Sequence, residues 1–234
     1  MDRSSRERET GVVRASAVVG TAATLTSWLL SRVDRAAFVP YFGGLEPVVA
    51  TAIVATIGIA AILTLRRGGW FVLAGPPNRA GLRLAFLLAT LFAVGAIGFD
   101  LLARFPRGIN EPLPVAAGFY PLMGLVAETV FHLAPLALVL GIGGRVWPDR
   151  REGLVLAAIV VAAAIEPAFQ VRAGLAAGRL SGTDLFVVPH VLGFNLAQLW
   201  LLRRYDLLSM LALRMGYYLY WHLAWGALRL ELLF

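Results

Sequence analysis

Residues 114–143 read PVAAGFYPLMGLVAETVFHLAPLALVLGIG, and this stretch decides the class of the protein. Glu128 and His132 are its only acidic or basic side chains. As one helix it would be about 45 Å long, which exceeds the roughly 30 Å hydrocarbon core of a bilayer. We therefore expect a membrane-spanning helix that is kinked, or divided into two segments, at Pro121 and Pro135.

The rest of the chain has the same apolar character. Hydrophobic residues make up 59% of the 234 residues and charged residues only 15%, which is unusual for a soluble domain. Six further stretches are long and apolar enough to cross a bilayer. We predict an all-α, polytopic transmembrane helix bundle with seven spans, or eight if the fourth is two segments, at residues 12–31, 46–65, 82–103, 114–143, 154–171, 185–202 and 206–230.

The chain divides by composition into three regions. We expect a polar N-terminal tail at residues 1–11, N-terminal transmembrane helices at 12–110 and a helical core with the polar site at 111–234. The first apolar run is interpreted as a retained span and not as a secretory signal. Arg14 interrupts it, and no small-residue cleavage pattern follows before Arg32.

Arginine placement indicates the partner and the orientation. All 21 basic residues are arginine, and most lie in the short breaks between spans and not in one patch. This distribution predicts a lipid bilayer as partner and no nucleic acid. With a cytoplasmic N-terminus, thirteen arginines fall on the inner side and seven on the outer, which favours that orientation in the plasma membrane. The chain has no cysteine, so thiolate metal sites and cysteine nucleophiles are excluded.

A set of polar side chains lies inside the predicted spans, where a charge costs a few kcal/mol and usually marks function. Glu128 and His132 are four residues apart and share one helix face, as do Glu166 and Gln170. Each helix therefore carries a polar stripe that should turn towards the other helices. The remaining members of the set are His190, Asn195, Gln198, Arg214 and His222.

Estimated depth favours one common site. Glu128, Glu166, His190 and His222 fall between the bilayer centre and the outer face if the helices alternate in direction. Imidazole and carboxylate are ordinary zinc ligands, and a catalytic zinc leaves one position for water. We predict a divalent metal, Zn²⁺ by preference, in a metal-dependent hydrolase. The predicted ligands are His132, His190 and His222, the catalytic carboxylates are Glu128 and Glu166, and the supporting residues are Gln170, Asn195, Gln198 and Arg214.

Most of these residues also have a structural interpretation, which the sequence leaves open. His132 could bond a backbone carbonyl freed by Pro135, and His190 could anchor a helix end. Glu166 could be the ion partner of Arg214. Outside the predicted set, Asp100 is expected to be a local ion partner, since it lies close to Arg104.

The segment from Ala127 to His222 resembles the CAAX-protease and bacteriocin-processing (CPBP) family of intramembrane metalloproteases. The run AETVFH at 127–132 resembles the family motif Glu-Glu-x-x-x-Arg, with Glu128 at the second glutamate. The run WLLRRYD at 200–206 resembles the stretch before the last motif, and His222 resembles its histidine. The second motif, Phe-x-x-x-His, fits Phe186 and His190 by pattern, or Ala162 and Glu166 by helix order. The sequence departs from the family at Ala127, His132 and Gly226, where the family has glutamate, arginine and asparagine.

The resemblance implies an intramembrane metal-dependent endopeptidase that acts on a hydrophobic or lipid-modified peptide. Two other functions remain open on the same residues. One is an ion- or proton-coupled transporter that uses Glu128, Glu166 and Arg214 as a relay. The other is a catalytically inactive membrane scaffold of the same fold.

Overall fold

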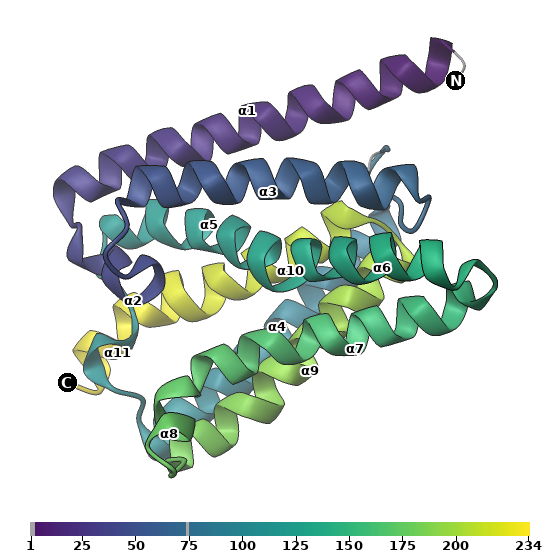
Figure 1. Ribbon diagram of the computed structural model, residues 1–234. Helices are drawn as coiled ribbons and strands as arrows, with labels where there is room; N and C mark the ends of the chain where they lie inside the picture. The colour runs from purple at the N-terminus through teal and green to yellow at the C-terminus, as the bar shows by residue number, and fades with distance from the viewer. Residues whose placement is uncertain (1–2, 74) are drawn as a thin grey trace.

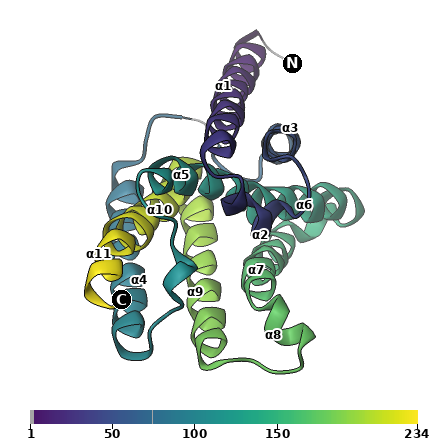
Figure 2. The same ribbon diagram turned by 90° about the vertical axis from the view of Figure 1, so that its left-hand side faces the viewer.

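The computed structural model describes residues 3–73 and 75–234, with side chains from Gly11 onward (Figures 1 and 2). Within these ranges the regular elements are helices, and no strand occurs. The α-helices are α1 (Arg3–Val33), α2 (Val39–Phe42), α3 (Pro47–Arg67), α4 (Arg79–Ala103), α5 (Val115–Ala127), α6 (Ala134–Val146), α7 (Arg151–Gln170), α8 (Arg172–Ala176), α9 (Gly182–Arg204), α10 (Leu207–Tyr218) and α11 (Gly226–Leu232). Single 3-10 turns are η1 (Ala36–Phe38), η2 (Arg107–Ile109) and η4 (Pro148–Arg150), and π-helical turns are η3 (Glu128–Leu133) and η5 (Leu219–Trp225).

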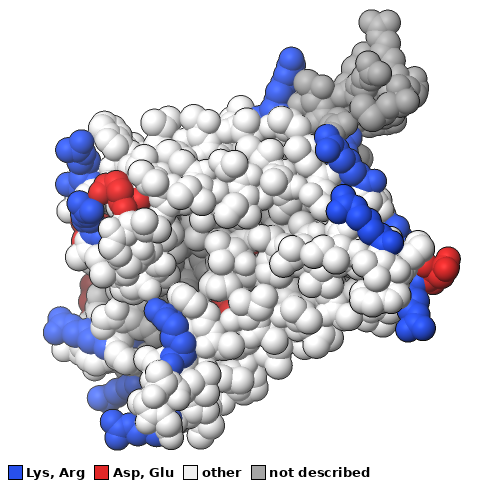
Figure 3. All heavy atoms as spheres, viewed as in Figure 1, with Lys and Arg blue, Asp and Glu red and all other residues white. Residues whose placement is uncertain are grey.

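The bundle belongs in a membrane. Six helical segments of the described chain are long and apolar enough to cross a bilayer. In Figure 3 the basic side chains gather at the two ends of the molecule, and the face between them is almost entirely uncharged. The sequence prediction of an all-α, integral membrane protein is confirmed at this level. The six segments are Gly11–Val33, Pro47–Arg67, Arg79–Ala103, Val115–Val146, Pro148–Gln170 and Gly182–Arg204.

Two details differ from the sequence prediction. α1 begins at Arg3, so most of the expected N-terminal tail continues the first helix; residues 1–2 lie outside the described residues. The long fourth stretch is one helical segment, Val115–Val146, and Pro121 lies inside α5 without ending it. The irregularity is the π-helical turn η3, just before Pro135. Proline lacks an N–H and its ring crowds the carbonyl four residues earlier, so a wider turn relieves the clash.

The helices define two ends, which are visible in Figure 1. The N-terminal end holds the turns at 68–78, 147–150 and 205–206, and the opposite end holds the segments at 34–46, 104–114 and 171–181. At the N-terminal end, Asp206 links the starts of α4 and α10. Its carboxylate accepts from the backbone N–H of Ser209 at the start of α10 and from that of Asn78 at the start of α4. These bonds satisfy helix-start donors that would otherwise be unpaired.

Small residues allow the helices to pack closely. α4 buries a stripe at i, i+4 spacing, Gly81, Ala85, Ala89 and Ala93, and packs against α10. A Cβ added to Gly216 of α10 would lie 3.0 Å from Cβ of Ala89. Close backbone approach through small residues is the usual way in which helices associate in lipid.

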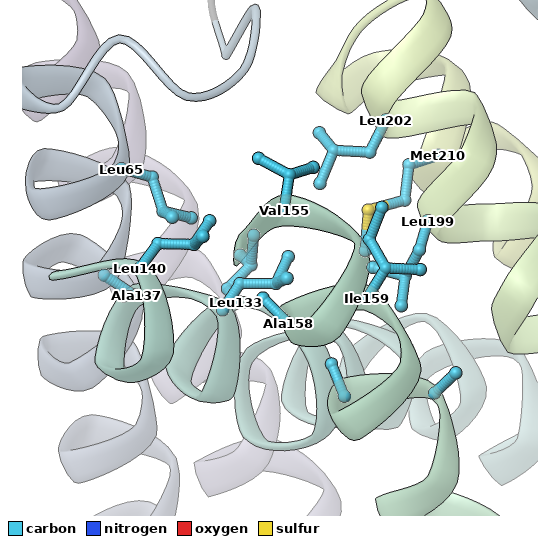
Figure 4. Packing of buried hydrophobic residues seen from close by; sticks show 14 residues of the cluster. Leu65, Leu133, Ala137, Leu140, Val155, Ala158, Ile159, Leu199, Leu202 and Met210 are labelled. Atoms are coloured by element: carbon cyan, nitrogen blue, oxygen red, sulfur yellow. The ribbon is translucent and has the colours of Figure 1, made fainter. Parts of the chain in front are cut away.

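One of the apolar core clusters lies towards the N-terminal end. Figure 4 shows Val155 of α7 between two groups of this cluster, Leu65 of α3 with Leu140 of α6 on one side and Leu199 of α9 with Met210 of α10 on the other. All are buried. This cluster fixes the rotation of five helices about their axes, and so decides which of their side chains face the polar site.

Candidate functional site

Glu128 lies at the centre of the bundle, at the start of the π-helical turn η3. It is 1% exposed and contacts three side chains. Nδ1 of His132 lies 2.9 Å from its Oε2, while Nε2 of Gln198 and Nε of Arg214 both donate to Oε1. π-helical turns inside α-helices are frequent at functional sites, because they redirect side chains that an α-helix would place elsewhere.

Arg214 of α10 is the node that joins the helices. Its Nη1 and Nη2 donate to the two carboxylate oxygens of Glu166, at 3.0 and 2.8 Å, while its Nε holds Glu128. Gln198 Oε1 accepts from Nη2 at 3.0 Å, and the Tyr218 hydroxyl accepts from Nη1 at 3.1 Å. One buried guanidinium therefore holds groups from η3, α7, α9 and α10, and a fork of five donors suits such multiple pairing.

The other predicted supporting residues surround this node. Asn195 donates to the carbonyl of Ala163 at 3.1 Å, and its Oδ1 lies 3.5 Å from Arg214. Nε2 of Gln170 donates to Oε1 of Glu166 at 3.5 Å. The structure thus brings together both predicted carboxylates, all four supporting residues and one predicted metal ligand, His132.

The charges of this network do not cancel. With both carboxylates ionised, Glu128 and Glu166 carry two negative charges against the one positive charge of Arg214, so these three groups hold one excess negative charge. Unpaired charge is costly in a bundle core. Nε2 of His132 is buried and lacks a hydrogen-bond partner among the described residues. The structure therefore leaves one polar atom, and one unit of charge, for a proton, water or ligand to satisfy.

The other two histidines lie apart from the node. His190 packs between Phe186 and Phe92, and its Nε2 is 3.4 Å from the Tyr217 hydroxyl. His222 stacks on Tyr120, with 4.0 Å between ring centroids, and its Nδ1 lies 2.8 Å from Oδ1 of Asn110.

The predicted three-histidine metal site does not fit this arrangement. Among the described residues, no three histidine, aspartate or glutamate side chains lie together in a way that could hold a metal ion. A zinc ion needs its ligands within about 2.0–2.3 Å of one point. His132, His190 and His222 have different partners, Glu128, Tyr217 and Asn110, so they do not form one ligand set in this conformation. We assign no chemical step to a metal.

A large cavity connects the node to His190 and His222. We call it the main cavity. It has a volume of about 660 Å³, and its wall is mostly apolar and aromatic, as in small-molecule sites. Figure 3 shows a hollow in the uncharged face with a small acidic patch beside it. The polar side chains that line it include those of Glu166, Gln170, His190, Arg214, Tyr218 and His222.

A second cavity, of about 410 Å³, approaches the node from the other side. Its lining includes Glu128 and Thr51, whose buried hydroxyl has no partner among the described residues. It extends to Leu73 and Leu207 at the N-terminal end, whereas the main cavity extends to segments of the opposite end. Each cavity thus reaches one carboxylate of the pair that Arg214 bridges.

Sequence reasoning missed a second buried ion pair. Asp100 pairs with Arg229 of α11 at 2.7 and 2.9 Å, and not with Arg104 as expected. It also accepts from Nε1 of Trp225 and from the backbone N–H of Phe105. This pair fastens the C-terminal helix to α4. A signal was present, since Arg229 lies at the end of the last predicted span, but spacing alone could not choose between Arg104 and Arg229.

Comparison with known proteins adds no relative: no protein-family model, no curated protein and no solved structure matches this chain.

Proposed function

We propose that this integral membrane protein hydrolyses a hydrophobic or lipid-modified peptide within the bilayer, as a divergent relative of the CPBP family. The observation that carries the proposal is the position of Glu166. Its buried carboxylate faces a large apolar cavity, together with Tyr218 and His222. The apolar wall suits the substrate, and a carboxylate at the wall can accept a proton from an attacking water.

The hydrogen bonds leave each group free for its role. A carboxylate has about four lone-pair positions, and Arg214 and Gln170 occupy three of those on Glu166. In the proposed reaction, Glu166 takes a proton from water, the hydroxide attacks the peptide carbonyl, and the proton passes to the leaving amine. Tyr218 accepts a hydrogen bond from Arg214, so its own O–H can donate to the oxyanion.

The test uses purified protein and a fluorogenic hydrophobic peptide in detergent or nanodiscs. We expect Glu166→Gln to abolish hydrolysis and Tyr218→Phe to slow it about 10²-fold or more. Glu152→Gln, which changes an exposed carboxylate on the same helix, should leave the rate unchanged. Wild-type protein that folds and hydrolyses no peptide in a broad hydrophobic library would end the proposal.

The predicted zinc ion has its own test. Metal analysis of protein purified without chelator should find about one divalent ion per chain if the resemblance extends to the metal, and much less in His132→Ala. Less than a tenth of an ion per chain in both proteins would separate this chain from metal-dependent members of the family.

The finer topology is part of the proposal. We infer that Leu207–Leu232 is a seventh span, although Arg214 and the polar aromatic residues around His222 lower its hydropathy. The arginine distribution supports a cytoplasmic N-terminus in the plasma membrane as part of this proposal.

Transport is the second candidate, and the pair of cavities favours it. They approach the Glu128–Arg214–Glu166 bridge from opposite ends of the bundle and share Val54 and Val126 in their walls. Ion flux into proteoliposomes that disappears in Glu128→Gln, from a protein that hydrolyses no peptide, would favour transport over hydrolysis.

A further inference from the structure

Arg172 lies at the mouth of the main cavity, at the opposite end of the bundle. Its Nη1 donates to the carbonyl of Phe169 at 2.8 Å, and its Nη2 donates to that of Pro40 at 3.2 Å. The guanidinium carbon lies 3.9 Å from the centre of the Phe169 ring. These contacts hold the cation in place between α7 and the segment that carries α2.

Arg172 forms no ion pair within the described part of the chain. Its hydrogen bonds go to two carbonyls, and no carboxylate among the described side chains forms an ion pair with it. A guanidinium has five N–H donors, so most of them remain for a ligand. Their planar fork matches phosphate oxygens.

The depth of Arg172 indicates where such a phosphate would come from. Arg172 lies two residues after Gln170, which is the last residue of the candidate span Pro148–Gln170. Arginine at a span end lies at the level of the lipid headgroups. A phosphate at this level belongs to a lipid of the adjacent leaflet.

The cavity beyond Arg172 suits a hydrocarbon chain. Its wall includes Phe119, Phe131 and Phe194. The one other guanidinium in the wall, Arg214, is already paired with two carboxylates. The cation that has no ion pair among the described side chains, Arg172, is therefore at the mouth, and the apolar surface lies behind it.

We propose that the main cavity binds one chain of an anionic phospholipid, with the phosphate on Arg172 and the chain along the aromatic wall. Such a lipid would occupy the cavity when substrate is absent and compete with it. This lipid site shares its cavity with the proposed function but does not depend on peptide hydrolysis. A measurement of lipid binding alone therefore tests it.

The test measures lipid binding to the full chain by native mass spectrometry, with phosphatidylglycerol, phosphatidylcholine and chain-free glycerol phosphate as probes. We expect wild type to prefer phosphatidylglycerol over phosphatidylcholine by about fivefold, and to retain no glycerol phosphate. Arg172→Gln should lose the preference, and Arg172→Lys, which keeps the charge and loses the planar fork, should keep only part of it. Arg179→Gln removes the same charge from an exposed residue nearby that does not line the cavity, and should keep all of it.

Three results would overturn the proposal. Equal binding of both phospholipids by wild type would show that no headgroup site exists. An equal loss in Arg172→Gln and Arg179→Gln would show a diffuse surface charge effect. Retention of glycerol phosphate would show a site for free phosphate, without a role for the chain. If Arg172→Gln fails to fold, the comparison of Arg172→Lys with wild type in the same assay decides. Lipid selectivity without peptide hydrolysis would refute only the hydrolase proposal.

Discussion

Arg214 is the residue on which the buried polar network depends. Two carboxylates from different helices, Glu128 and Glu166, both pair with this one guanidinium. Removing a single partner from a buried ion pair is far more costly than the net value of the pair, because the charge left behind has neither water nor a counter-ion.

We expect Arg214→Met to destabilise the protein by about 3–5 kcal/mol, measured by reversible unfolding in mixed micelles. The matched control is Arg203→Met, because Arg203 pairs with Glu152 at 2.6 Å on the exposed surface. It should cost less than about 1 kcal/mol. Adding Glu128→Gln and Glu166→Gln should restore part of the stability of Arg214→Met. Equal losses in the two arginine variants would contradict the role of Arg214.

Glu111, outside the spans, predicts a dependence of stability on pH. Partial burial and the neighbouring negative charge of Asp34 raise the pKa of Glu111 above its usual 4.5. An acid with a raised folded pKa binds its proton more tightly in the folded state, so stability falls as pH rises from the unfolded towards the folded pKa. Glu111→Gln should therefore have a higher melting temperature than wild type at pH 8, with the difference shrinking towards pH 4. A difference that grows on acidification would contradict this assignment.

At the scale of elements, two π-helical turns lie beside the polar network. η3 begins at Glu128, and η5 contains His222. Pro135 accounts for the first, whereas nothing in the sequence of the second accounts for it. α5 and α10, the helices that precede these turns, contact each other, with Gly124 of α5 facing Met215 and Tyr218 of α10.

Close packing of α4 on α10 gives a test with a control in the same helix. A Cβ added to Gly81 would lie 2.3 Å from Oγ of Ser209 and 2.9 Å from Cγ of Tyr205, so a neighbouring side chain would have to shift. We expect Gly81→Ala to cost about 1–3 kcal/mol. Gly98→Ala meets nothing within 4 Å and should be neutral or stabilising by up to about 1 kcal/mol. Thermal unfolding of both variants in one detergent provides the comparison, and equal effects would show that the helices are further apart.

At the scale of the whole molecule, the unequal number of arginines at the two ends of the bundle predicts the orientation of the chain in the membrane. The absence of cysteine makes this testable with single cysteines and a membrane-impermeant maleimide. Gly44→Cys, at the opposite end, should react in intact cells, whereas Asp149→Cys, at the N-terminal end, should react only after permeabilisation. The reverse pattern would invert the topology and place the mouth of the main cavity on the cytoplasmic side.

Contacts within one helix could be predicted from the sequence. The four-residue spacing anticipated that Glu128 meets His132 and that Glu166 meets Gln170, and the structure shows both contacts. Membrane insertion was equally accessible, because a bilayer selects apolar length, which is a local property. Helical geometry fixes which side chains share a face, whatever the rest of the chain does.

Contacts between helices were decided only by tertiary structure. Sequence reasoning assigned His190 and His222 to one metal site with His132, but the structure gives each a different partner and puts Arg214 between the two glutamates. Equal depth does not bring side chains together, because each helix can still rotate about its axis. That rotation is set by the packing of small and aliphatic residues on neighbouring helices, which no single helix encodes.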